Sequence, residues 1–420
     1  MGFIGGTQQQ SFVGRIRDRE REQMLAVPID VGKRTAAALV CDFWGELVGE
    51  PFEFGLNEHG FKAMSAEIAR ASAARNATWV RVGVEQAGHY HQTLIARLQA
   101  DSYDIVLFNP LQVKENRSQD LVAALKSDAR DLGAMADLLT RGKGRAPFHA
   151  DAAMATQAAL AVHRARKVKA RTALKNQILA SLDVVFPGLG DCFEDIFKSR
   201  LGLLILREGL EPRRVRRLGP ERLRSFARHR GLRTRGATVE RVVQAARQAL
   251  LLPEERASVH ARVLAADVSL LGRLDAEVSE TEAGLAEVLP RTPSGILVTM
   301  PRVGVVRASG YGAAIGDPHR FQSASQVYRF SGLVPRLYES AGRRRPGTHI
   351  SKDGKVDLRQ ALLQLGLALR TGHEPSAHYA RQLQARGKAT GVVACALANR
   401  ANRIAFAMVR DQSPFDSRKW

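Results

Sequence analysis

The 420-residue chain has only three cysteines, Cys41, Cys192 and Cys395, and they lie far apart. This spacing excludes a disulfide framework or a cysteine-based zinc site and is typical of a protein of the reducing cytoplasm. No run of about 18 apolar residues occurs, so we expect no membrane-spanning segment and no membrane partner. P-loops, dinucleotide fingerprints and the H-E-x-x-H zinc motif are also missing, which leaves ATP, NAD and zinc-protease chemistry unsupported.

Acidic residues are scarce: 42 Asp and Glu stand against 63 Lys and Arg, giving a net charge of +21. A generally basic proteome could produce this excess, but the arginines are clustered, with ten in residues 211–235 alone. Clustered cations are typical of contacts with nucleic-acid phosphates. The candidate contacts are Arg213, Arg214, Arg216, Arg217, Arg302, Arg343, Arg344, Arg345, Lys352 and Lys355.

The first third of the chain reads as an α/β domain. Three short strands are predicted within residues 25–54, followed by a helix at 58–74 that begins after the N-cap Asn57. A strand at 77–85, a helix at 89–100 and a strand at 103–110 come next. The succession β-β-β-α-β-α-β is typical of the ribonuclease-H-like fold.

The rest of the chain is predicted to be mainly helical. Two long helices, at 151–183 and 254–289, flank a basic helical insert, and a helical hairpin stalk of coiled-coil type and an ordinary helical bundle are equal alternatives. Around Pro301–Gly304, a turn between two helices resembles a helix-hairpin-helix element, which grips DNA backbone. The expected divisions are an arm at 1–22, an α/β domain at 23–145, a helical stalk with its insert at 146–289, a further domain at 290–375 and a helical end at 376–420.

Four carboxylates form a candidate metal site. Asp30 and Glu85 each end a predicted strand, and Asp128 and Asp131 are three residues apart, on one face of a helix. Each acid could instead cap a turn or a helix. Together, however, converging carboxylates would repel one another unless cations held them, and oxygen ligands suit Mg²⁺ or Mn²⁺. Two such ions can assist phosphodiester cleavage.

These acids and their flanking sequences resemble the insertion-sequence one-ten transposases, relatives of the Piv and MooV DNA invertases. The matching stretches are IDVGK, VGVEQAGHYH and KSDARDLGAMADLL, and then MPRVGVVRASGYGAAIGDPHRF and the segment from SASQVYRF to RQALL. In the turn, Arg302 stands where that family usually has glycine. The resemblance covers about residues 23–410.

The resemblance implies a RuvC-like domain with the DEDD set Asp30, Glu85, Asp128 and Asp131, and a C-terminal domain with a serine nucleophile. GLVPRLYESAGRRR places Ser340 at that position, beside Arg343–Arg345, which could hold the scissile phosphate. It also implies a prokaryotic, nucleoid-associated enzyme acting on double-stranded DNA. A homodimer or homotetramer would bring the two domains together, and a structured RNA encoded by the element would guide it.

Two other functions remain open from the residues alone. In one, a Holliday-junction-type endonuclease or a DNA invertase, the acids would cut DNA. In the endonuclease, water would attack and Ser340 would be idle. A nucleic-acid-binding protein without catalytic activity would need neither the acids nor Ser340. We expect a transposase or recombinase that cuts and rejoins DNA.

Overall fold

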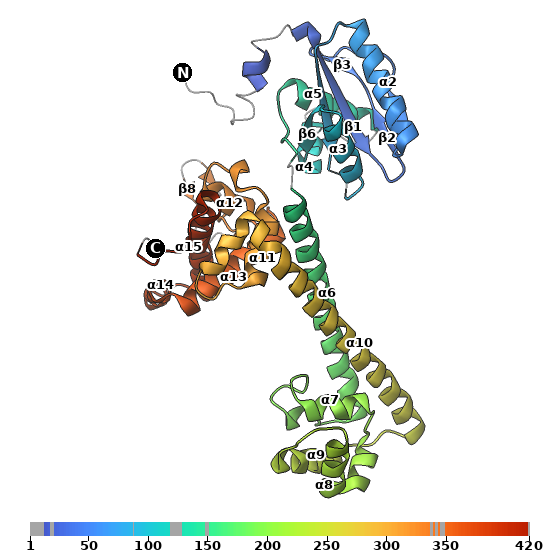
Figure 1. Ribbon diagram of the computed structural model, residues 1–420, viewed down its shortest axis with the longest axis vertical. Helices are drawn as coiled ribbons and strands as arrows, with labels where there is room; N and C mark the ends of the chain where they lie inside the picture. The colour runs from blue at the N-terminus through green and yellow to red at the C-terminus, as the bar shows by residue number, and fades with distance from the viewer. Residues whose placement is uncertain are drawn as a thin grey trace. The chain divides into compact units, whose positions relative to one another are not determined.

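The chain divides into two compact units, Met1–His149 and Ala150–Trp420, here called the sheet unit and the helical unit. The computed structural model describes residues 12–16, 21–86, 88–117, 128–147, 151–336, 339–340, 343–344 and 349–418, with the backbone alone for Asp128 and for the four residues of 339–340 and 343–344. The first unit combines helices with a mixed sheet, and the second is mainly helical (Figure 1), which is the expected α/β plus α class.

The sheet unit is built on a mixed sheet with the strand order β4-β2-β1-β5-β6. The strands are β1 (Met24–Val31), β2 (Thr35–Ala38), β3 (Cys41–Asp42), β4 (Phe52–Gly55), β5 (Trp79–Glu85) and β6 (Asp104–Phe108), preceded by a 3₁₀ turn, η1 (Arg21–Gln23). β1, β2 and β4 form an antiparallel meander, whereas β5 runs parallel to β1, and β6 parallel to β5. The predicted succession of strands and helices is found, except that one predicted strand is divided in two and one helix is added.

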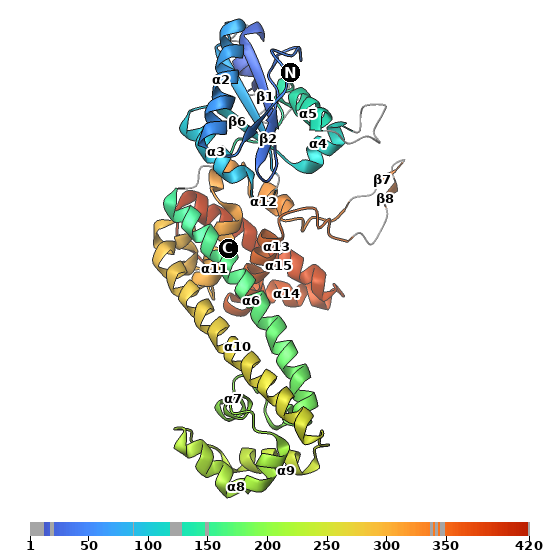
Figure 2. The same cartoon turned by 90° about the vertical axis from the view of Figure 1, so that its right-hand side faces the viewer.

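Helices cover both faces of this sheet. Figure 2 shows α2 (Glu58–Ala74) and α3 (His91–Ala100) on one side and α4 (Pro110–Arg117) and α5 (Asp128–Thr140) on the other. The alternation of β1 explains the two layers, because Leu25, Val27 and Ile29 pack with α2 and α3 while Ala26 packs with α5. α2 begins as predicted, with the Asn57 side chain accepting a hydrogen bond from Gly60 N at 2.9 Å.

The stretch 35–43, expected as one strand, is divided into β2 and β3. Both pieces pair with β1 in one register, Ala38 opposite Ile29 and Cys41 opposite Ala26. The break therefore falls opposite Pro28, which has no N–H to donate to the ladder.

Two other segments of the sheet unit differ from expectation. Pro110 follows β6 but also begins α4, which was not predicted; proline suits a first helical position because its missing N–H is not needed there. Residues 12–16, expected within a flexible arm, are helical. Phe12 is buried in contact with Met24 and Trp79, and its ring centroid lies 5.8 Å from that of Trp79.

Two long helices, α6 (Ala152–Val185) and α10 (Glu254–Val288), lie side by side in the helical unit (Figures 1 and 2). They are antiparallel, because residues early in α6 contact residues late in α10. Towards one end the pair is apolar, and the buried residues of α10 recur at heptad spacing. They include Ala257, Ala261, Leu264, Val268, Leu271, Val278 and Leu285.

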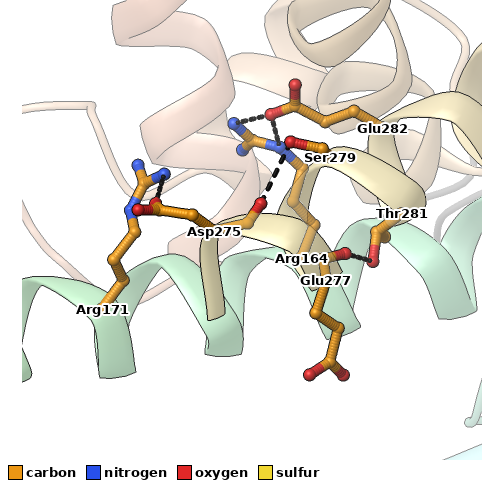
Figure 3. A network of polar contacts seen from close by, with 7 residues as sticks. All are labelled: Arg164, Arg171, Asp275, Glu277, Ser279, Thr281 and Glu282. Carbon is orange, nitrogen blue, oxygen red and sulfur yellow. Dashed lines mark hydrogen bonds and ion pairs between the residues drawn. The ribbon is translucent and has the colours of Figure 1, made fainter. Parts of the chain in front are cut away.

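Towards the other end, ion pairs connect the two helices (Figure 3). Arg171 Nη1 lies 3.1 Å from Asp275 Oδ1, and Arg164 Nε donates to Glu282 Oε1 at 2.7 Å. Lys167 Nζ lies 2.6 Å from Glu277 Oε1, and this hydrogen bond lowers the pKa of Glu277. These partly exposed pairs add little stability one by one, but together they favour one register.

The basic insert closes the far end of the helix pair. It contains η2 (Gly190–Cys192), α7 (Arg200–Arg207), α8 (Pro212–His229) and α9 (Gly236–Gln248). Its apolar side chains share one core with the facing ends of α6 and α10. α8 is kinked at Gly219, which has a φ of 63° and precedes Pro220.

The opposite end of the helix pair carries the second core, built chiefly on α11, α13 and α15. The elements there are η3 (Leu289–Arg291), η4 (Pro293–Thr299), α11 (Val305–Ile315), η5 (Pro318–Arg320), α12 (Ala324–Phe330), β7 (Glu339–Ser340), β8 (Arg343–Arg344), α13 (Val356–Gly372), α14 (Glu374–Ala385) and α15 (Thr390–Asp411).

Within the described residues, α15 is long and apolar enough to cross a membrane, with a mean hydropathy of 1.3 over its most apolar 18 residues. However, 56% of that stretch is buried inside the protein. Ala401, Ile404 and Ala405 lie in the core shared with α13. A core helix passes the same test of length and composition, so this hydropathy is weak evidence for a membrane.

Candidate functional site

Asp30 and Glu85 lie next to each other at the ends of two adjacent strands. β1 and β5 are parallel, and Ile29 stands opposite Val84. Asp30 and Glu85 are the next residues on each strand, and both are half-buried. Neighbouring strands are about 4.8 Å apart, so the backbone brings these two carboxylate-bearing positions within reach of one ion.

Both acids are on the face of the sheet that α5 covers. Alternation along each strand puts Asp30 on the face of Ala26, and Glu85 on the face of Gly83. Gly83 allows α5 to approach closely, because a Cβ at this position would lie 3.0 Å from the Leu139 side chain and 2.5 Å from that of Phe108. The closeness of α5 at this point therefore depends on a residue without a side chain.

The direction of α5 brings its first turn towards the same edge of the sheet. Gly142, just beyond the helix, lies against the Phe12 ring. Phe12 packs on Met24 and Trp79, which begin β1 and β5. The C-terminal end of α5 therefore lies at the start of these strands, and its N-terminal end, with Asp128 and Asp131, points towards their C-terminal ends.

Asp131 already has a cationic partner. The residue is only 6% exposed, and Arg117 Nη1, at the end of α4, donates a hydrogen bond to Asp131 Oδ1. Sequence reasoning did not identify Arg117. Asp128 begins α5, and its side chain lies outside the described part of the structure.

The candidate ligands fit a hard divalent cation by donor type, because all four are carboxylates. Among the described side chains, which do not include Asp128, no three His, Cys, Asp or Glu residues form a group that could hold a metal ion. The Arg117 contact is consistent with this, since it occupies one oxygen of Asp131.

Ser340 is in a two-stranded hairpin. It ends β7, where it pairs with Arg343 of β8, and Glu339 pairs with Arg344. Arg345 lies outside the described residues. The base of the hairpin is held by a hydrogen bond from Arg336 N to His349 O at 2.9 Å. Nearby, Leu333 and Ile350 pack in the second core.

Three other serines near Ser340 in the sequence have structural partners. Ser331 is fully buried, and its Oγ donates to Tyr328 O at 2.6 Å. Ser323 caps α12, and Ser351 Oγ donates to Gly332 O at 3.4 Å. Cysteine is no better a nucleophile at Cys41, because burial raises the pKa of that thiol to about 12.

The four arginines at the start of α8 fall into two pairs. Arg216 donates from Nε to Ala246 O at 2.5 Å and from Nη2 to Ala249 O at 2.8 Å, and Arg213 donates to Leu252 O at 2.9 Å. This pair satisfies carbonyl groups at and after the end of α9, where cations are favoured. Arg214 and Arg217 are exposed, so they are the members of the run that face solvent.

The predicted cations of the C-terminal region also differ in role. Arg302 and Lys352 are exposed. Lys355 is exposed along its stem, but its Nζ donates to Ala314 O in the last turn of α11 at 3.1 Å, and burial of the ammonium end lowers its pKa. Lys355 therefore anchors α11 to the start of α13, and phosphate contacts are better assigned to the other two.

Arg302 has a left-handed backbone, with a φ of 61°. This is a conformation that glycine adopts easily, and glycine is the residue that the resemblance leads one to expect at this position. Next to it, Gly304 is the N-cap residue of α11 and has no side-chain cap hydrogen bond. The arginine thus adds a charge beside this helix start at a cost in backbone strain.

We expect Arg302→Gly to weaken DNA binding with little change in stability. Relief of strain, about 1–2 kcal/mol, is offset by the greater freedom of glycine in the unfolded chain. Loss of one phosphate contact should lower the slope of log affinity against log salt by about 1. Fluorescence anisotropy with duplex DNA at several salt concentrations measures this. Arg302→Lys keeps the charge and serves as the control; equal slopes for Arg302→Gly and the parent would contradict the expectation.

Two segments of the chain match models of transposase families. Residues 27–187, which contain the four acids, match a transposase family model of DEDD type, and residues 294–380, which contain Ser340, match the IS116/IS110/IS902 transposase family. The arginine run at 213–217 lies outside both matched segments.

Curated relatives agree with these matches. The chain is 25% identical over 403 residues to a 44.8 kDa protein of insertion element IS116 from Streptomyces clavuligerus, covering 94% of this chain and 97% of that protein. It is 28% identical over 126 residues to a pilin gene-inverting protein of Moraxella bovis, covering 30% of this chain and 39% of the relative. It is 33% identical over 122 residues to the transposase of IS1328 from Yersinia enterocolitica, covering 28% of this chain and 36% of the relative. The chain therefore belongs to the IS110 family of transposases, and it is a DNA transposase or recombinase.

Proposed function

We propose that this enzyme cuts and rejoins DNA with Ser340 as nucleophile and with Asp30, Glu85, Asp128 and Asp131 holding Mg²⁺ or Mn²⁺. The observation that supports this most is the register of β1 and β5, which puts Asp30 beside Glu85 on the face towards α5. A structural role for both acids would not require them to be neighbours at one edge.

The fold supports the same assignment. Three antiparallel strands come first, and two helix–strand units follow, whose strands β5 and β6 run parallel to β1. This arrangement agrees with a ribonuclease-H-like domain. When bound, divalent ions supply positive charge at the attacking and leaving oxygens of a phosphodiester. The contribution of the chain itself is to hold oxygen ligands on β1, β5 and α5.

Ser340 would carry the DNA strand between cutting and joining. Its Oγ attacks the phosphorus as one P–O bond of the backbone breaks, so a serine phosphoester forms, the serine proton passes to a base and a DNA hydroxyl is released. A DNA hydroxyl then attacks the same phosphorus and frees Ser340. Such transesterification needs no ATP, in agreement with the missing P-loop. The basic residues Arg343 and Arg344, paired with Ser340 and Glu339, suit a phosphate at this position.

The net charge of +21 supports a nucleic-acid partner. We propose that a structured RNA from the same element guides the choice of DNA, as the resemblance implies, and that the protein contacts phosphates. Arg214 and Arg217 on the insert are exposed and available for such contacts. Sequencing of RNA that copurifies with the full chain tests this; a preparation without any discrete transcript would contradict it.

We expect chelation with EDTA to reduce strand cleavage by at least about a hundredfold, because the proposed site needs a divalent ion to stabilise charge on the phosphate. Gel analysis of nicked and joined donor DNA measures the loss, and excess Mn²⁺ should restore activity. DNA binding by the chelated protein is the control. Cleavage at an unchanged rate in EDTA would contradict the metal site.

A second candidate function is DNA inversion. The relative from Moraxella bovis is named a pilin gene-inverting protein, and its similarity to this chain covers 126 residues. Inversion uses the same cutting and rejoining chemistry on two sites in one molecule. A plasmid carrying two inverted element ends, scored for inversion against excision, distinguishes the two functions.

A further inference from the structure

We propose that Arg117 is a positioning residue of the metal site proposed at the four acids, acting through Asp131. Its guanidinium neutralises the Asp131 carboxylate before metal binds, and it competes with the metal for that carboxylate. This inference rests on the proposed metal site. It adds a residue from α4 that belongs neither to the four acids nor to the basic clusters.

The contact is built into the fold. The Arg117 side chain is 18% exposed and that of Asp131 is 9% exposed, so both charges lie largely out of water. The neighbouring Asn116 fixes the end of α4 to α5, since its Nδ2 donates to Ala134 O at 3.0 Å and to Asp137 Oδ2 at 2.9 Å. The guanidinium is therefore held at Asp131 by packing as well as by charge.

Physical chemistry gives this pair two effects. A buried carboxylate without a counter-charge is costly, so Arg117 stabilises the metal-free fold. An incoming divalent ion, however, must displace the guanidinium from an oxygen of Asp131 and meets its positive charge nearby. Arg117 should therefore weaken metal binding while it strengthens the metal-free protein. A purely structural ion pair would produce only the second effect.

The experiment compares Mn²⁺ binding by the parent chain and by full-length Arg117→Gln, measured from the EPR signal of free Mn²⁺. Melting temperatures of both proteins are measured with and without Mn²⁺. We expect Arg117→Gln to bind Mn²⁺ about tenfold more tightly, a change of about 1.4 kcal/mol. Without metal, the melting temperature of Arg117→Gln should be about 2–4 °C below that of the parent. On addition of Mn²⁺, the melting temperature of this variant should rise by more than that of the parent. Arg117→Lys keeps a cation in place and should restore values near those of the parent.

Arg141→Gln is the matched control, because Arg141, the residue after α5, pairs through Nε with Asp137 of that helix at 2.9 Å, with both side chains more exposed. It should leave Mn²⁺ affinity unchanged. Equal or weaker Mn²⁺ binding by Arg117→Gln overturns the role of Arg117 and leaves the proposed function intact. A parent chain that binds no Mn²⁺ overturns the metal site itself. If Arg117→Gln does not fold, tighter Mn²⁺ binding by Arg117→Met supports the proposal and unchanged binding overturns it.

Discussion

Asp30→Asn is expected to reduce DNA cleavage by about a thousandfold or more, the largest effect of any substitution in the sheet unit. Asparagine keeps the size of the side chain but removes the negative charge at the end of β1. The adjacent Glu85 would then have to bind a divalent ion without its neighbour on β1. Single-turnover cleavage of donor DNA, followed on sequencing gels, measures the loss.

The control is Glu53→Gln, which removes a carboxylate from an exposed position on β4 of the same sheet. It should retain the cleavage rate of the parent. Circular dichroism and DNA affinity should stay unchanged in both variants. If Asp30→Asn cuts as fast as Glu53→Gln, the acids are structural, and the alternative of a protein that only binds nucleic acid gains support.

Ser340→Ala is expected to lower the yield of rejoined DNA by about 10⁴-fold, since it removes the nucleophile and leaves the acids in place. No covalent complex between protein and DNA should form. Denaturing gels with labelled donor DNA show both the joined product and any complex trapped on the parent enzyme.

Ser351→Ala is the matched control, because Ser351 lies near the base of the same hairpin. It loses two long hydrogen bonds, one to Gly332 O at 3.4 Å and one from Asp353 N at 3.3 Å. Joining should be normal in this variant. Cleavage that persists in Ser340→Ala, with water in place of serine, would identify an endonuclease of the junction-resolving kind instead of a transposase with a serine intermediate.

Local sequence was sufficient to predict most of the sheet unit. The N-cap Asn57 stands where the pattern placed it, Glu85 ends β5 as predicted, and Asp30 comes one residue before the end of β1. The pattern did not predict the break between β2 and β3. This break lies opposite Pro28, so predicting it requires the register of β1 with β2 and β3. α4 was missed because Pro110 was predicted to be the last residue of the strand at 103–110, whereas proline also suits a helix start.

The site was predictable in its acids but not in their surroundings. Arg117 carries no local signal, because its partner Asp131 is in a different helix and only packing of α4 on α5 brings them together. The arginine run predicted phosphate contacts for all four of its members, but Arg213 and Arg216 bind carbonyl groups of the same insert. Charge alone does not separate an anchoring arginine from one that faces solvent.

The antiparallel ion pairs between α6 and α10 limit how this protein can change length during evolution. Deleting a single residue from α6 turns everything beyond it by about 100°, which would take Arg164 and Arg171 away from Glu282 and Asp275. Only changes of about seven residues, two full turns, keep the same side chains facing each other, and both helices must change together. Homologues should therefore differ in the span between their two helical ends by whole steps of roughly 10 Å.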